Sequence, residues 1–221
     1  MAGARYDDIV DWYQEFRPSL RSDELDALER LLGHGDGRCL DVGCGTGVST
    51  AAVAGLGWSI VGVDVSAQLL EVPRAAGFEV VRASTDALPF DDASFDAAVS
   101  VWTHTDLDDF PTAMAEVTRV LRPSAPFVYV GGHPCFVGPH SRFLHGQGIP
   151  ELHPGYAGAR RYDGTAPGVA DPEGLRARVG AVHLPLAGFL DAFLAAGLRL
   201  ERFEELGRLD YPYMVALRAR R

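Results

Sequence analysis

The sequence predicts an α/β fold in which a mainly parallel sheet of seven strands has helices on both faces. From Arg38 to about Val130, short apolar runs alternate with helical patterns, which is typical of consecutive βαβ units. Near the C-terminus, the β-rich runs LRLERFEEL and YPYMVALRAR are separated by a Gly-containing turn, so we expect them to pair antiparallel. Together these patterns indicate a Rossmann-like, doubly wound sheet with an antiparallel C-terminal hairpin.

The first half of the pattern predicts two strands, each followed by a helix. The run RCLDV, Arg38–Val42, leads into the glycine-rich segment GCGTG and then into VSTAAVAGL, whose small and apolar residues suit a packed helix. The run SIVGVD, Ser59–Asp64, precedes Ser66, which is placed to cap the helix of AQLLEVPRAAG. We expect Pro73 to kink or shorten that helix.

The second half predicts three more strands, a long insertion and two more helices. FEVVRA, FDAAVSVW and APFVYV have the composition of strands. Asp109 is placed to cap the helix PTAMAEVTRVL, which should stop before Pro123. After Val130 the pattern changes to Gly, Pro, His and aromatic residues, so we expect an insertion or lid at about 132–183 that determines specificity. The segment PLAGFLDAFLAAGL predicts the last helix.

Length and charge restrict the kind of protein. With 221 residues, the chain is long enough for one well-buried domain, so we expect a single domain over residues 1–221. Asp and Glu outnumber Lys and Arg by 30 to 20, and a formal net charge of -10 repels phosphate backbones and anionic lipid surfaces. We therefore expect neither nucleic acid nor a membrane as a partner.

The N-terminus and the cysteines indicate a reduced, cytoplasmic protein. The segment MAGARYDDIVDWYQEF contains acidic residues and has no apolar core of signal-peptide length, and no stretch approaches the ~20 apolar residues of a membrane span. Cys39, Cys44 and Cys135 are odd in number and lack C-x-x-C spacing. That pattern argues against both a disulfide framework and a zinc site.

The segment LDVGCGTG carries the strongest functional signal. Gly43, Gly45 and Gly47 allow the backbone to turn sharply after Asp41 and to approach a ligand closely. A dinucleotide fingerprint G-x-G-x-x-G would need a glycine at position 48, where this chain has Val48. A nicotinamide-dependent oxidoreductase is therefore only the third candidate function.

This segment and the blocks after it resemble class I S-adenosylmethionine (SAM)-dependent methyltransferases. LDVGCGTG is similar to motif I of that family, and VGVDVS, FDAAVSVW and RVLRPSAPFVYVGG are similar to its later blocks in the same order. The resemblance covers the chain from about Tyr6 to Val130 and returns at the C-terminal helix and hairpin. It implies that the cofactor is SAM.

The resemblance also implies a role for each matching position around motif I. Asp41 and the loop residues Gly43, Cys44 and Gly45 would hold the amino-acid end of SAM, with Asp41 acting directly or through the glycine-loop amides. Asp64 would accept hydrogen bonds from both ribose hydroxyls, because one carboxylate suits two neighbouring donors.

Four further positions would complete the contacts with the cofactor. The resemblance places Val65 against the adenine ring and the carbonyls around Ser100 and Val101 near the ammonium group. It places Tyr13, on the N-terminal helix, over the carboxylate.

The segment ASTDALPF departs from the family pattern. The family often has an acidic residue in a G-D-A context before L-P-F, where this chain has Ser84, followed by Thr85 and Asp86. Either Ser84 contacts the exocyclic amine of adenine, or the loop shifts so that Asp86 reaches it. All three residues are assigned to the cofactor site.

Histidines near two strand ends are the candidate bases. Methyl transfer from a sulfonium is an in-line displacement, so a base is needed only when the acceptor atom is protonated. His104 and His133 follow the fourth and fifth strands, at the sheet edge where ligands bind in open α/β folds. His140, His145 and His153 are irregularly spaced and lack a nearby acidic partner, so we expect no metal site.

The resulting expectation is an enzyme that transfers a methyl group from SAM to an oxygen or nitrogen of a small organic molecule. The acceptor should lie between the N-terminal helix and the insertion. Four aromatic residues of the insertion either form an apolar wall there or pack within the lid: Phe136, Phe143, Tyr156 and Tyr162. The alternative is a protein of the same fold that binds SAM without methylating and catalyses a cyclisation-type reaction.

Overall fold

The computed structural model describes residues 4–143, 149–169, 171–207 and 210–221. In chain order the elements are η1 (Asp7–Ile9), α1 (Val10–Phe16), α2 (Ser22–Leu32), β1 (Arg38–Val42), α3 (Val48–Gly55), β2 (Ser59–Asp64), α4 (Ala67–Ala75), β3 (Glu79–Arg82), β4 (Ala97–Val101), α5 (Phe110–Val120), β5 (Pro126–Gly132), β6 (Ser141–Phe143), β7 (Pro150–Leu152), β8 (Arg160–Tyr162), α6 (Leu175–Val179), β9 (Ala181–His183), α7 (Leu186–Ala195), β10 (Arg199–Leu206) and β11 (Met214–Arg220).

Seven strands form one sheet in the order β10-β11-β5-β4-β1-β2-β3. β1 lies between β2 and β4 and is parallel to both, and β4 pairs parallel with β5. β11 is antiparallel to both β5 and β10. The prediction of a mainly parallel seven-stranded sheet with an antiparallel C-terminal hairpin is confirmed.

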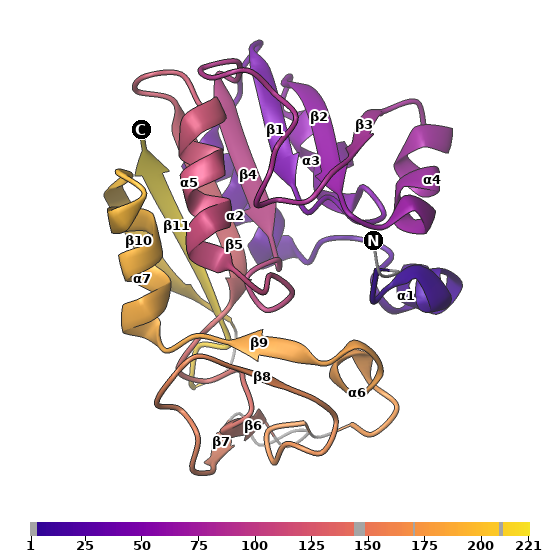
Figure 1. Cartoon of the computed structure of the whole chain (residues 1–221), viewed down its shortest axis with the longest axis vertical. Coiled ribbons are helices and arrows are strands. Elements are labelled where there is room, and N and C mark those ends of the chain that lie inside the picture. Colours follow the sequence, from indigo (N-terminus) through magenta and orange to yellow (C-terminus); the bar gives the residue numbers. More distant parts are fainter. Residues whose placement is uncertain (1–3, 144–148, 170, 208–209) are drawn as a thin grey trace.

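Helices cover both faces of the sheet (Figure 1). α5 and α7 pack on one face, where Phe110, Phe189 and Phe193 belong to the larger buried core. α2 and α3 pack on the other face through residues that include Leu28 and Val53. Because both faces are covered, the central strands are nearly continuous apolar runs, which is why the sequence pattern predicted them.

Capping residues start the two helices that border the strand ends. The hydroxyl of Ser66 accepts a hydrogen bond from the Leu69 amide at 3.0 Å and caps α4. Asp109 caps α5 through the Thr112 amide, also at 3.0 Å. Pro73 lies inside α4, and the helix ends shortly after it.

The segment between β5 and α7 lies beyond the carboxyl ends of the parallel strands, on the same side as α1 (Figure 1). It contains two small antiparallel sheets, β6 with β7 and β8 with β9, together with the short helix α6. Strands of this length are too short to produce a readable alternation in the sequence. The insertion is therefore more regular than its composition indicated.

Three further features bear on function. Within the described ranges, no helix is long and apolar enough to cross a membrane. In the same ranges, no group of three or more His, Cys, Asp or Glu side chains is arranged to hold a metal ion, and His145 lies outside them. The three cysteines are free thiols, and burial raises the pKa of Cys39 and Cys44.

Candidate active site

The loop after β1 turns sharply at two glycines. Gly43 and Gly45 have φ angles of +73° and +52°, in the left-handed region that favours glycine. A Cβ atom at Gly43 would lie 2.4 Å from Cγ2 of Thr103, so a larger residue would push the loop away from β4. The amides of Gly43 and Cys44 donate to the carbonyl of Val63 at 2.8 and 3.0 Å. These contacts fix the loop at the carboxyl ends of β1 and β2.

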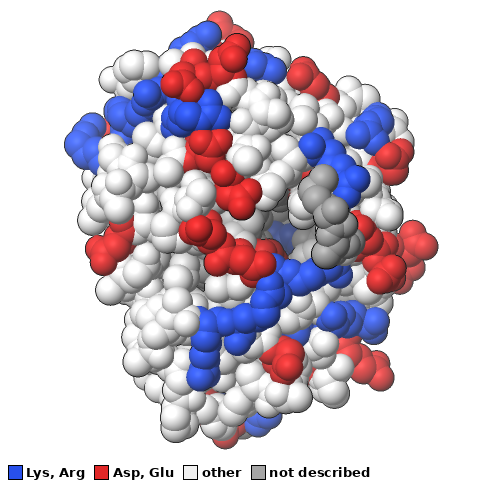
Figure 2. All heavy atoms as spheres, viewed as in Figure 1, with Lys and Arg blue, Asp and Glu red and all other residues white. Residues whose placement is uncertain are grey.

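A cavity of about 480 Å³ opens at this loop, and its volume is in the usual range for small-molecule sites. Figure 2 shows a hollow on this face of the molecule, with acidic and basic side chains around it. The predicted cofactor residues that line the cavity are Tyr13, Gly43, Gly45, Asp64, Val65, Ser84, Thr85, Asp86 and Val101. The fold therefore brings together residues from separate segments of the chain.

Asp64 lies at the end of β2, on the wall of this cavity. Its Oδ2 accepts a hydrogen bond from the Gly45 amide at 3.0 Å, and its Oδ1 accepts one from the Ser66 amide at 2.9 Å. A carboxylate has about four acceptor positions, so capacity remains for the two hydroxyls of a ribose. Burial raises the pKa of Asp64, against the lowering effect of the two amides. The side chain of the adjacent Val65 is 41% exposed and offers an apolar surface that an adenine ring can cover.

Asp41 and Cys44 are not part of the described cavity wall. Asp41 is fully buried, and its Oδ2 accepts hydrogen bonds from the hydroxyls of Ser49 and Thr50 at 2.8 and 2.7 Å. The expected route from Asp41 through the glycine-loop amides is not found, because the Gly45 amide donates to Asp64 instead. The Oδ1 atom of Asp41 has no partner among the described residues, and burial raises the pKa of Asp41 to about 6.

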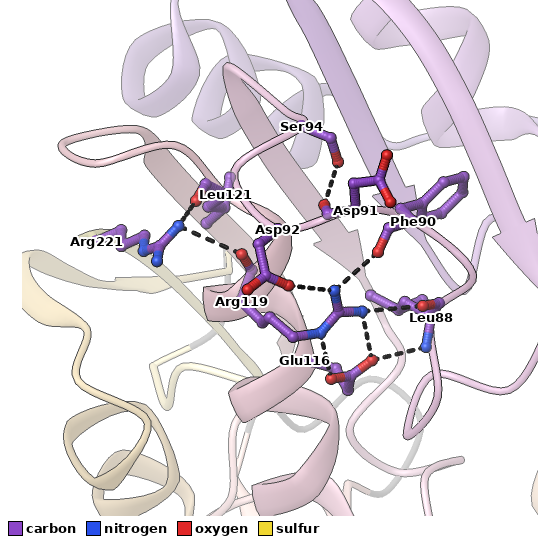
Figure 3. Close-up of polar contacts among 9 residues, drawn as sticks. All are labelled: Leu88, Phe90, Asp91, Asp92, Ser94, Glu116, Arg119, Leu121 and Arg221. Atoms are coloured by element: carbon purple, nitrogen blue, oxygen red, sulfur yellow. Dashed lines mark hydrogen bonds and ion pairs between the residues drawn. The ribbon is translucent and has the colours of Figure 1, made fainter.

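The loop between β3 and β4, which contributes residues 84–86 to the cavity, is anchored to α5 (Figure 3). The guanidinium of Arg119 donates to the carbonyls of Leu88 and Phe90 at 2.9 and 2.8 Å. Arg119 also forms an ion pair with Glu116 at 2.7 Å, and Glu116 accepts a hydrogen bond from the Leu88 amide at 2.8 Å. α5 thereby fixes the path of this loop.

A second cavity, of about 330 Å³, lies beside the first. Both cavities are lined by Tyr6, Tyr13, Trp102 and Asp106, so these four residues form a shared wall. The remaining walls of the second cavity come from α1, from the start of α2 and from the part of the insertion around α6. The second cavity thus lies between the N-terminal helix and the insertion, and binding of the acceptor there stays a prediction.

Asp106 is the acidic residue of the shared wall. Its Oδ1 accepts hydrogen bonds from the Tyr6 hydroxyl at 3.0 Å and from Nη1 of Arg176 at 2.8 Å. Its Oδ2 has a single long contact among the described residues, 3.4 Å from the hydroxyl of Thr105. Burial, with Asp106 nearby, raises the pKa of Tyr6 well above its usual value, so the phenol stays protonated. Oδ2 of Asp106 therefore has the capacity to accept a further hydrogen bond.

The fully buried Glu24 holds two residues of the second cavity in place. Its carboxylate accepts hydrogen bonds from Nη2 of Arg17 at 3.0 Å and from the indole Nε1 of Trp102 at 2.6 Å. The Arg17 guanidinium also lies over the Trp102 ring, 5.5 Å from its centroid. Trp102 has a φ angle of +61°, which a bulky residue adopts only where its surroundings hold it. The indole is thus fixed between the two cavities.

His104, the first candidate base, lies in the core and does not line either cavity as described. It is 2% exposed, and its Nδ1 forms a hydrogen bond with the Tyr129 hydroxyl beside Phe110 and Phe189. Burial lowers the pKa of His104 to about 3, with a further lowering by Arg176. The ring is therefore neutral at pH 7 and a weak proton acceptor.

His133, the second candidate base, is also buried and does not line either cavity as described. Its Nε2 lies 2.9 Å from Oε1 of Glu205, and its Nδ1 accepts a hydrogen bond from the Cys135 amide at 3.1 Å. Proton transfer by His104 or His133 stays a prediction.

The aromatic residues of the insertion pack mainly against their neighbours. Phe136, Tyr156 and Tyr162 are absent from the described walls of both cavities, and the side chain of Phe143 lies outside the described part of the chain. The ring of Tyr156, for example, contacts that of His140 with centroids 5.1 Å apart. The cavity-facing part of the insertion is instead the stretch around α6.

Sequence reasoning missed Asp106, Glu24 and Arg176. Asp106 had a readable signal, because it follows the fourth strand at the sheet edge where ligands bind. Glu24 could be predicted only as part of an amphipathic helix. Arg176 had no local signal, since its contact with Asp106 joins residues 70 positions apart.

Comparison with known proteins shows that part of the chain is similar to a named family. Residues 40–129 match the family described as "Methyltransferase domain". The O-methyltransferase cnsE of Penicillium expansum is 41% identical over 108 residues, which are 43% of this chain and 39% of that protein. A demethylmenaquinone methyltransferase of Tropheryma whipplei is 34% identical over 119 residues, 51% of this chain and 50% of that protein. The chain thus spans half or less of the length of these two curated relatives.

A solved structure is similar over most of the chain. The SAM-dependent methyltransferase from Mesorhizobium loti has a TM-score of 0.73 and 25% identity, covering 90% of this chain and 98% of that one. The comparisons confirm the resemblance to class I SAM-dependent methyltransferases and support SAM as the cofactor. The matched residues 40–129 include the glycine loop, Asp64 and residues 84–86.

Proposed function

We propose that the protein transfers the methyl group of SAM to an oxygen or nitrogen atom of a small organic molecule. The observation that carries this proposal is the wall shared by two adjoining cavities. In-line displacement needs the acceptor atom, the methyl carbon and the sulfur in one row, and two adjoining cavities with lining residues in common support a site where the acceptor faces the cofactor. The name of the Penicillium relative, an O-methyltransferase, supports oxygen as the acceptor atom. The size of the smaller cavity supports a role in small-molecule metabolism, and the free cysteines support a reducing compartment such as the cytoplasm.

The larger cavity would hold the cofactor. Asp64 would accept hydrogen bonds from the ribose hydroxyls, Val65 would cover the adenine, and residues 84–86 would contact its exocyclic amine. The glycine loop and the carbonyl of Val101 would face the amino-acid end, with Tyr13 over it. When bound, SAM supplies an electrophilic methyl group on a sulfonium. The residues of this chain then need only bind SAM and the acceptor, orient them toward each other and exclude water.

Asp106 would take up the proton of the acceptor. Methyl transfer would leave the carbon–sulfur electron pair on sulfur and one proton to be removed from the acceptor. Oδ2 of Asp106 would receive that proton, while Tyr6 and Arg176 hold the carboxylate through Oδ1. This role differs from that of His104 or His133, so the two assignments can be separated.

Steady-state kinetics of three variants test the proton acceptor. We expect Asp106→Asn to lower kcat by about 10²-fold while SAM affinity changes little, because the amide preserves shape but cannot accept the proton. His104→Gln and His133→Gln should retain more activity than Asp106→Asn. A large loss of kcat in one histidine variant alone, in a folded protein, would assign proton transfer to that histidine instead.

Formation of S-adenosylhomocysteine tests the reaction class. With a panel of phenols and amines, the proposed function requires one S-adenosylhomocysteine for each methylated product. SAM binding without S-adenosylhomocysteine formation across the panel would contradict methyl transfer and favour the cyclisation-type alternative.

A further inference from the structure

We propose that the acceptor is a planar aromatic carboxylic acid whose ring lies in the smaller cavity and whose carboxylate binds Arg21. This inference rests on the proposed methyl transfer and names the substrate class for it. It follows from the aromatic walls of the cavity, from the lack of a carboxylate partner for Arg21 among the described residues, and from the positions of Arg21 and Asp106.

The walls of the smaller cavity favour a flat ring. Tyr6, Tyr13, Phe16 and Trp102 all line it. The indole of Trp102 is fixed by its 2.6 Å hydrogen bond to the buried Glu24, so one aromatic surface is rigid before any ligand binds. Aromatic rings favour stacked or edge-to-face contacts with one another, which a flat acceptor can make and a bulky aliphatic one cannot. A cavity of about 330 Å³ accommodates one or two rings, not a polymer.

The charged residues of the same cavity leave one arginine without a carboxylate partner among the described residues. Three arginines and two aspartates line it, although the whole chain has a formal net charge of -10. Arg17 is neutralised by Glu24 at 3.0 Å, and Arg176 by Asp106 at 2.8 Å. Asp171, on the insertion side, uses Oδ1 to accept a hydrogen bond from the backbone amide two residues further on.

Arg21 is the cation of this cavity that lacks a carboxylate partner among the described residues. Its Nη1 donates to the Tyr213 hydroxyl at 2.9 Å, and its guanidinium lies over the Tyr213 ring, 5.3 Å from the centroid. These contacts orient the guanidinium, and within the described part of the chain neither Nε nor Nη2 has a hydrogen-bond acceptor. Two parallel N–H donors match the geometry of a carboxylate, which gives a bidentate hydrogen bond.

The positions of Arg21 and Asp106 also set the direction of the ligand. Arg21 lines the smaller cavity and not the larger one, whereas Asp106 belongs to the wall that the two cavities share. A carboxylate bound to Arg21 would leave the other end of the ring to reach the shared wall. A hydroxyl or amino group at that end would meet the methyl group and Asp106. The predicted substrate class thus has its acid and its nucleophile at opposite ends of the ring.

Calorimetric titration of the full chain, saturated with S-adenosylhomocysteine, tests this assignment. The probes are 4-hydroxybenzoate and 4-hydroxycinnamate, each compared with its neutral primary amide. We expect each acid to bind at least about tenfold more tightly than its amide, since charge-assisted bidentate hydrogen bonds are the stronger kind. In Arg21→Gln this preference should fall to within about threefold, with S-adenosylhomocysteine affinity unchanged. The matched control, Arg199→Gln on the exposed edge strand β10, should keep the full preference.

Three outcomes would overturn the substrate class. The first is that the amides bind as tightly as the acids, and the second is that Arg21→Gln keeps the preference for the acid over the amide. The third is that neither acid binds to a chain that binds S-adenosylhomocysteine. Failure of the proposed function gives a different result. In that case S-adenosylhomocysteine itself does not bind, or no acceptor of any charge is methylated. Methylation of neutral phenols alone would leave methyl transfer intact and exclude only the aromatic acid.

Discussion

Asp64 connects three parts of the site: the end of β2, the Gly45 amide of the glycine loop and the Ser66 amide before α4. We expect Asp64→Ala to weaken SAM binding by about tenfold or more. A charge-assisted hydrogen bond contributes about 1.5 to 3 kcal/mol, and about 1.4 kcal/mol corresponds to a factor of ten in affinity. Calorimetric titration with SAM measures the change.

The control for Asp64 is Asp26→Ala, which removes an exposed carboxylate on α2. SAM affinity of the control should equal that of the wild type. Unchanged affinity in a folded Asp64→Ala variant would remove Asp64 from the cofactor site.

Asp41 predicts a pH dependence of stability. Its pKa in the folded chain is about 6, against 3.8 for the free side chain, because burial opposes ionisation. A carboxyl group with a raised pKa contributes stability below pH 3.8, and that contribution is lost as the pH rises through 6. The wild type should therefore lose about 1 kcal/mol of unfolding free energy between pH 5 and pH 8 from this group.

Urea unfolding of Asp41→Asn without cofactor checks this effect. Asparagine can still accept hydrogen bonds from Ser49 and Thr50 but does not titrate. The unfolding free energy of the variant minus that of the wild type should be more positive at pH 8 than at pH 5. A constant difference between the two proteins across this range would show that Asp41 does not titrate there.

At the scale of elements, α5 serves as the anchor for the loop that contacts adenine in the proposed function. Arg119→Met would remove the hydrogen bonds to Leu88 and Phe90 and the ion pair with Glu116. We expect a loss of about 1 to 2 kcal/mol of stability, because two backbone carbonyls lose a charged donor. SAM affinity should also fall, since residues 84–86 are no longer held.

Thermal and urea unfolding, with SAM titration, measure both effects. The control Arg74→Met removes an exposed ion pair with Glu71 on α4 and should cost less than about 0.5 kcal/mol. If Arg119→Met had the same stability and the same SAM affinity as the wild type, the loop would keep its path without this anchor.

The elements differ in how readily the sequence predicts them. β1 and β2 have the bounds of the apolar runs that predicted them, because strands buried on both faces need continuous apolar sequence. The glycine loop was predictable for a related reason: positive φ angles at a strand end require glycine. Most residues that line the larger cavity follow from that loop and from the next strand ends.

The smaller cavity could not be predicted in the same way. Its walls combine α1, the start of α2 and the insertion around α6, which are far apart in the sequence. The Asp106–Arg176 and Trp102–Glu24 contacts depend on tertiary packing and leave no periodic pattern. The surroundings of His104 could not be predicted either: its position after β4 indicated the ligand-binding edge of the sheet, whereas the side chain packs among aromatic residues of the core.

At the scale of the whole molecule, binding of SAM should raise the melting temperature. A ligand that binds only the folded state stabilises it by mass action, by about 2.7 kcal/mol at a concentration one hundred times its dissociation constant. NADH should give no shift at the same concentration, because the glycine loop lacks the third glycine of the dinucleotide fingerprint. Differential scanning fluorimetry with both ligands makes the comparison, and a shift with NADH alone would contradict the assignment of SAM.

The shared wall has a consequence for how the protein can change over evolution. Exchanges that change the size of Tyr6, Tyr13 or Trp102 alter both cavities at once, so in the proposed function they would disturb the cofactor together with the acceptor. Phe16, Val169 and Leu175 line the smaller cavity alone. Substitutions at these three positions can accumulate independently of the cofactor. A lineage of such proteins could therefore acquire new acceptors while each intermediate remains a working enzyme.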